Sequence, residues 1–84
     1  MKQLKYKIEI VEWVDSFGCT STWSEIKPIS TILICQTVGF VISENEDVIS
    51  IANSVAEETD NTVEQANGIM TIPKACIKHR KTVR

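Results

Sequence analysis

The stretch GIMTIPKACIK, residues 68–78, decides the fold that we predict for this chain. Apolar residues lie on both sides of Pro73, whose fixed φ and missing N–H prevent it from continuing a central strand ladder. Pro73 can instead begin a single 3₁₀ turn, an element of only about 3–4 residues. We therefore expect a strand, one 3₁₀ turn and a last short strand that ends near Val83.

Alternating side chains predict another strand near the N-terminus. Residues 5–10 alternate polar and apolar side chains, which favours Ile8 and Ile10 as core-facing positions. The phase then slips, and Val11 and Trp13 become the apolar positions. A strand covered on both faces would give this pattern, and so would a β-bulge.

The middle of the chain predicts a hairpin. Residues 31–43 form the strongest strand and carry apolar side chains in both phases, so we expect both of its faces to be covered. Within this strand Gly39 would allow a sharp coil of the strand or the close approach of another backbone. Residues 44–47 are typical of a turn, and residues 48–52 predict the returning strand.

Two segments lack a strand pattern. Residues 15–30 are rich in turn formers and indicate a long loop. In that loop Trp23 must either cover an open end of the fold or stand exposed for a partner. Residues 53–67 fit either a short helix or an extended acidic loop.

The pattern I-P-x-x-x-I at residues 72–77 resembles the end of SH3-like barrels, where one 3₁₀ turn separates the last two strands. Sm-like barrels share the five-strand design. We therefore expect residues 1–84 to form a single, mainly β domain. Its predicted architecture is a small antiparallel SH3-like (Sm-like) barrel of about five strands, with the acidic loop or short helix at about 53–67.

A second resemblance covers nearly the whole chain. Its elements are VEWVDS at 11–16, Trp23, CQTVGF at 35–40, Asp47 and GIMTIP at 68–73. This order is similar to that of many small uncharacterised phage and prophage proteins. The resemblance implies a phage accessory protein in the bacterial cytoplasm, and it assigns no role to any residue.

Composition sets outer limits on the protein class. The 84 residues include 9 Lys+Arg and 11 Asp+Glu, and 43% are hydrophobic, which is too many for a disordered chain. No apolar run approaches the ~18–20 residues that span a bilayer. Glu9 and Glu12 interrupt the only N-terminal stretch that could act as the apolar core of a signal peptide. We expect a cytoplasmic protein with no membrane partner.

Catalytic and metal signatures are weak. The sole histidine, His79, lies in a cationic run, and no nucleophile motif is present, so we do not expect an enzyme. The one possible four-ligand set is Cys19, Cys35, Cys76 and His79, which lacks the two closely spaced pairs of a structural zinc site. We expect free, buried thiols, no metal and no cofactor.

Charge is distributed unevenly. Residues 74–84 hold five basic and no acidic side chains, whereas residues 44–64 hold seven acidic and no basic ones. Simple alternation places Lys78 and Arg80 on one face of the last strand. That face either protects an edge strand or forms an anion site in which Arg80 binds a phosphate or carboxylate. With a pI of about 5.3, duplex nucleic acid is not an expected partner.

Other side chains extend this possible site. Trp13 or Trp23 near Arg80 would let a base stack above the anion. Gln36 occupies an apolar phase of the longest strand, so its amide is either satisfied by backbone groups at a bulge or points into a polar pocket. The candidate ligand-binding residues are Trp13, Asp15, Trp23, Gln36, Lys78 and Arg80.

These observations predict a non-enzymatic, phage-type binding protein that forms homo-oligomers. One hypothesis is counter-defence: capture of a host immune component, such as a small nucleotide signal held by Asp15, Trp23 and Arg80. A second is a protein–protein module that inhibits or recruits a host protein through acidic residues such as Glu57, Glu58 and Asp60. A third is an accessory of virion assembly.

Overall fold

The computed structural model describes residues 1, 4–16, 22–23, 25–26, 32–57 and 64–84. They form five strands and one short 3₁₀ helix. In chain order the elements are β1 (Ile8–Asp15), β2 (Leu33–Glu44), β3 (Val48–Glu57), β4 (Glu64–Pro73), η1 (Lys74–Cys76) and β5 (Ile77–Thr82).

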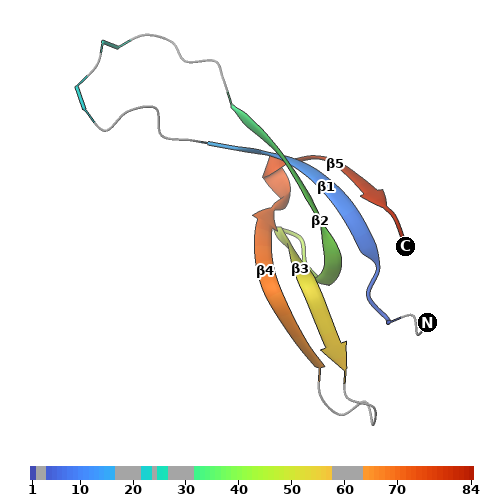
Figure 1. Cartoon of the computed structure of the whole chain (residues 1–84). Helices are drawn as coiled ribbons and strands as arrows, with labels where there is room; N and C mark the ends of the chain where they lie inside the picture. The colour runs from blue at the N-terminus through green and yellow to red at the C-terminus, as the bar shows by residue number, and fades with distance from the viewer. Residues whose placement is uncertain (2–3, 17–21, 24, 27–31, 58–63) are drawn as a thin grey trace.

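All neighbouring strands are antiparallel, and the order across the sheet is β4-β3-β2-β1-β5 (Figure 1). The mainly β class and the number of strands are therefore as predicted. The ladders of the described residues leave β4 and β5 as two unpaired edges, so the sheet is open. Closure into a barrel, which the sequence led us to expect, is not confirmed by the described strands.

The predicted turns are found immediately before β3 and immediately after β4. Asn45 Oδ1 accepts hydrogen bonds from the backbone N–H groups of Asp47 and Val48, which fixes the β2–β3 turn. Pro73, at φ −62°, precedes η1 as expected. The Lys74 N–H then donates to the Asp47 carbonyl oxygen at 2.8 Å, so this 3₁₀ turn is anchored to the β2–β3 turn.

The acidic segment 53–67 is neither a helix nor a loop where the structure describes it. β3 continues to Glu57 and β4 begins at Glu64, so residues 53–57 and 64–67 are paired strands. The remaining residues of that segment, 58–63, lie outside the described part of the chain. Ladder pairing with β3 stabilises residues 64–67 of β4 although their side chains are mostly polar, which a pattern based on apolar residues could not detect.

The core lies on one face of the curled sheet, which we call the inner face. Val11, Ile49, Ile51 and Ile72 are at most 1% exposed and pack together. They come from β1, β3 and β4, and the half-buried side chains that pack against them include Ile77 of β5. Residues from both edges of the sheet thus meet in a single cluster, which requires the sheet to curl.

The core-facing side of β1 differs from the prediction, which placed Ile8 and Ile10 toward the core. Glu9 is 2% exposed and Val11 is fully buried, whereas Ile8 and Ile10 point to the opposite, outer face and are half-buried. The register between β1 and β2 runs without interruption from Ile8 to Asp15. The slip in the sequence pattern therefore reflects a two-faced strand, and the core phase already begins at Glu9.

β2 is covered on one face only, contrary to the prediction. Val38 is 56% exposed and Ile34 is 70% exposed, and both lie on the outer face. Gly39 does allow the predicted close approach. A Cβ atom on Gly39 would lie 2.5 Å from the carbonyl oxygen of Ala52, so β3 can cross closely over β2 only because this position has no side chain.

A register shift changes the faces of β5. Trp13 pairs with Ile77, but Glu12 pairs with His79, so one extra residue of β5 is accommodated between these pairs. Val11 then pairs with Arg80. Arg80 consequently shares the inner face with Ile77, whereas simple alternation places these two residues on opposite faces, and Lys78 lies between the two pairs at the shift.

Candidate binding surfaces

Arg80 lies at the centre of a charged cluster on the inner face. Its Nε and Nη2 donate to the two carboxylate oxygens of Glu9 at 2.7 and 3.1 Å. Its Nη1 and Nη2 donate to those of Glu44 at 2.9 and 3.1 Å. Lys74 adds a 2.7 Å ion pair to Glu44, and Lys7 adds one of 3.2 Å to Glu9.

These contacts keep the two carboxylates ionised. The hydrogen bonds from Arg80 and Lys74 lower the pKa of Glu44 to about 2. Arg80 and, secondarily, Lys7 also lower the pKa of Glu9, against the effect of its burial. Since four hydrogen bonds to carboxylates already occupy the Arg80 guanidinium, this side chain is committed to the fold in the single chain.

The structure does not gather the six predicted ligand-binding residues into one site. Trp13 lies on the inner face and donates from Nε1 to Thr37 Oγ1 at 3.0 Å. Asp15 is exposed at the end of β1 and accepts a hydrogen bond from the Ser16 N–H at 2.9 Å. Lys78 is exposed on β5.

Gln36 is on the outer face rather than in a buried pocket. It is exposed, and its Nε2 donates to Glu12 Oε2 at 3.1 Å, directly across the β1–β2 ladder. From the sequence we considered two partners for the Gln36 amide, backbone groups at a bulge and a polar pocket. Neither of them satisfies it. The cross-strand carboxylate does so instead, which cannot be read from the spacing of one strand alone.

Trp23 is fully exposed. Its relative exposure is 102%, and that of Ile26 is 105%. The coloured pieces of chain at residues 22–23 and 25–26 lie well away from the five-stranded sheet (Figure 1). Of the two positions considered for Trp23, the structure thus has the exposed one.

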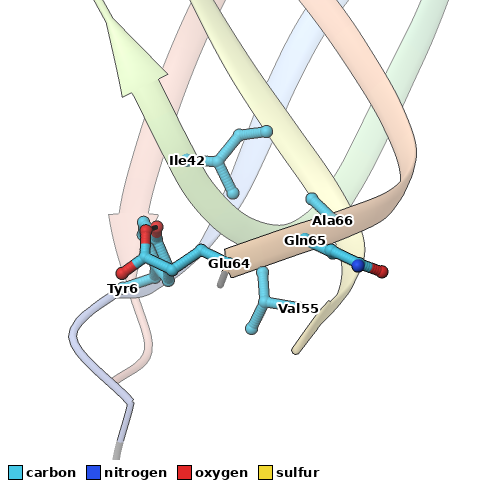
Figure 2. A pocket seen from close by; sticks show the side chains of 6 residues that line it. All are labelled: Tyr6, Ile42, Val55, Glu64, Gln65 and Ala66. Atoms are coloured by element: carbon cyan, nitrogen blue, oxygen red, sulfur yellow. Dashed lines mark hydrogen bonds between the residues drawn. The ribbon is translucent and has the colours of Figure 1, made fainter. Parts of the chain in front are cut away.

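One hollow between β3, β4 and the N-terminal segment is shown in Figure 2. Its volume is about 210 Å³, which is below the range of about 300–1,000 Å³ typical of ligand pockets. The Tyr6 hydroxyl donates to Glu64 Oε2 at 2.7 Å, and Lys5 pairs with the same carboxylate. Two polar groups of the lining, the Tyr6 hydroxyl and the Glu64 carboxylate, therefore bind one another. Its lining residues are Tyr6, Ile42, Val55, Glu64, Gln65 and Ala66.

The described interior also lacks an unsatisfied polar group that would await a ligand. Every buried side-chain nitrogen or oxygen there has a hydrogen-bond partner. Among the same residues no three His, Cys, Asp or Glu side chains are grouped as they would be around a metal ion. Cys35 and Cys76 are free and half-buried, and Cys19 lies outside the described residues.

The outer face of β1 and β2 carries the exposed side chains of Val38 and Ile34. We call it the β1–β2 outer face. It consists of four cross-strand pairs, three of them apolar and one polar. The pairs are Ile8 with Phe40, Ile10 with Val38, Glu12 with Gln36, and Val14 with Ile34.

Sequence reasoning missed two parts of these surfaces. It did not identify Glu9 and Glu44 as the partners of Arg80, although Glu9 occupies the same phase as Val11 and Trp13. It also assigned the apolar residues of the β1–β2 outer face to the core. An apolar strand pattern predicts that a face is covered, but it does not say whether this chain or another covers it.

No family model, curated protein or solved structure matches this chain. No helix in the described residues has the length and apolar character that crossing a bilayer requires.

Proposed function

We propose that this chain is a non-enzymatic binding protein whose partner is another protein, held by Trp23 and Ile26. The observation that carries the proposal is the complete exposure of both side chains, at 102% and 105%. A large apolar side chain without any cover is costly in water, and tryptophan is enriched among the residues that dominate protein–protein binding. The open sheet serves as the scaffold, and its strand order and the 3₁₀ turn before β5 support a fold of the SH3-like type.

The proposed partner is a protein of a bacterial host. This part of the proposal rests on the resemblance to phage and prophage proteins, which implies an accessory role, such as counter-defence, inside an infected cell. The alternative hypothesis places the host protein on an acidic face formed by residues 44–64. Two acidic residues of that face, Glu44 and Glu64, are held by basic groups of this chain. Glu58 and Asp60 of that face lie outside the described residues.

Capture of a small nucleotide signal is less well supported by the geometry of one chain. Arg80 is occupied by Glu9 and Glu44, and the piece of chain at residues 22–23 lies away from the sheet (Figure 1). A thermal-shift screen against nucleotides tests this alternative, because a bound ligand raises the melting temperature. Mass spectrometry of purified virions tests the third alternative, a role in assembly.

The direct test of the proposal compares retention of a host protein by four immobilised variants. Glu25 is exposed and lies between Trp23 and Ile26 in the sequence, so Glu25→Ala serves as the control. Wild type and Glu25→Ala should both retain one protein from a bacterial host lysate. Trp23→Ala and Ile26→Ala should lose it, with unchanged melting temperatures. Equal retention by all four variants would contradict the proposal.

A spectroscopic measurement on the purified chain complements this comparison. Trp13→Phe leaves Trp23 as the only tryptophan. Its emission should be that of a water-exposed indole in the isolated protein and should shift to shorter wavelength when the retained protein is added. A blue-shifted emission without any partner would show that this chain itself covers Trp23.

A further inference from the structure

We infer that the β1–β2 outer face binds a second copy of this chain, and that the two copies pack sheet against sheet in a symmetric dimer. This surface is distinct from Trp23 and Ile26, so the inference does not rest on the proposed function. Its starting point is the exposure of two aliphatic side chains of β2. Val38 is 56% and Ile34 is 70% exposed, although their ladder with β1 is complete.

The outer face is also complementary to itself. Glu12 lies between apolar pairs, and β5 adds His79 beside Glu12 and Lys81 beside Ile10 on the same side of the sheet. A two-fold axis brings the same patch together from both copies, so a patch must carry both signs of charge to avoid repulsion. The patch meets this requirement, because acidic Glu12 lies among its apolar pairs and basic His79 and Lys81 lie along its edge on β5.

The Glu12–Gln36 pair has a defined place in such a dimer. Gln36 Nε2 already donates to Glu12 Oε2, so the pair presents satisfied polar groups between apolar neighbours. A hydrogen-bonded polar pair within an apolar interface can fix the register of two packed elements, because a shifted register would bury it against carbon. The apolar pairs on either side, Ile10 with Val38 and Val14 with Ile34, add apolar contact area.

Sedimentation equilibrium over a range of protein concentrations tests the inference. Wild type should be a dimer at high concentration and dissociate on dilution. Val38→Lys should weaken the dimer by at least about tenfold, since it buries a charge in the interface. Ile26→Lys makes a matched aliphatic-to-lysine change outside the outer face, and it should dimerise like wild type.

The outcomes separate this inference from the proposed function. A monomeric wild type at every concentration would overturn the inference, as would Val38→Lys that dimerises unchanged. Loss of the dimer in Ile26→Lys alone would assign self-association to the surface that we propose for the host protein. Circular dichroism at low concentration should give the same spectrum for all three proteins. A second variant, Ile34→Ser, removes an exposed apolar group without adding charge and should weaken the dimer in the same direction.

Discussion

Glu9 and Arg80 are 71 positions apart in the chain, yet they form a two-pronged ion pair, with Arg80 Nε 2.7 Å from Glu9 Oε1. The Glu9 side chain is only 3% exposed, so its charge depends on this partner and on Lys7. The pair joins the first strand to the last on the inner face, where the sequence pattern would have placed apolar residues. It defines the position of β5 against β1 more specifically than the backbone ladder alone.

Arg80→Met should lower the free energy of unfolding by about 3 kcal/mol, because it leaves the Glu9 carboxylate buried with only Lys7 as partner. Urea denaturation followed by circular dichroism measures the change. Lys78→Met, on the exposed side of the same strand, is the matched control and should stay within about 0.5 kcal/mol of wild type. A loss as large in Lys78→Met would refute the special role of Arg80.

Replacing both partners should cost less than replacing one. In Arg80→Met with Glu9→Leu, no buried charge remains, so part of the lost stability should return. A double-mutant cycle of the four proteins gives the coupling energy, which we expect to be about 1–3 kcal/mol. Strictly additive effects would mean that the two side chains do not interact in solution.

Acid should destabilise the fold over a defined pH interval. The pKa of Glu44 falls from 4.5 when unfolded to about 2 in the folded chain, and that of Glu9 is also lowered. The stabilising contribution is therefore present above about pH 4.5 and is lost as the pH falls toward 2. Melting temperatures measured across this interval should fall steeply in wild type and less in Arg80→Met. Parallel curves would contradict the assignment.

Gly39→Ala should lower the free energy of unfolding by about 2 kcal/mol, since the new Cβ would lie 2.5 Å from the Ala52 carbonyl oxygen. The backbone of β3 cannot move away from β2 without disturbing Ile51. Ser43→Ala, at an exposed position of the same strand, should be nearly neutral. Thermal unfolding of the two variants decides the matter, and a neutral Gly39→Ala would mean that the strands cross less closely.

Two isoleucines in neighbouring strands should respond differently to truncation. Ile49 of β3 is fully buried, so Ile49→Ala should cost about 2–5 kcal/mol. Ile69 of β4 is 55% exposed, and Ile69→Ala should cost about 1 kcal/mol or less. Urea denaturation at low protein concentration, where association does not contribute, compares the two. Similar losses would show that the inner and outer faces are wrongly assigned.

The sequence predicted the elements of this fold better than their faces. Pro73 predicted η1 because its covalent ring excludes a continuous strand, and Gly39 predicted the close crossing for an equally local reason. The faces depend on non-local pairing. The extra residue near Lys78 reverses the alternation in β5, and the burial of Glu9 depends on a partner 71 positions away. No local pattern contains that information.

The same limit applies to the candidate site. Trp23 could be singled out because an indole among turn formers is unusual, but the sequence left open whether it covers an open end of the fold or stands exposed. The use of Arg80 as a ligand for an anion could not be judged, since its partners Glu9 and Glu44 come from other strands. The outer face was identified as apolar but assigned to the interior, because hydropathy does not distinguish a core from an interface.

The most direct test of these assignments is the rate of maleimide labelling at single introduced cysteines, mapped by peptide mass spectrometry. Val38→Cys lies on the outer face and Val41→Cys on the inner face of the same strand. We expect rapid labelling of Val38→Cys in dilute protein, slower labelling as the concentration rises, and protection of Val41→Cys throughout. Protection of Val38→Cys at every dilution, or faster labelling of Val41→Cys, would contradict an open sheet whose outer face meets a second copy.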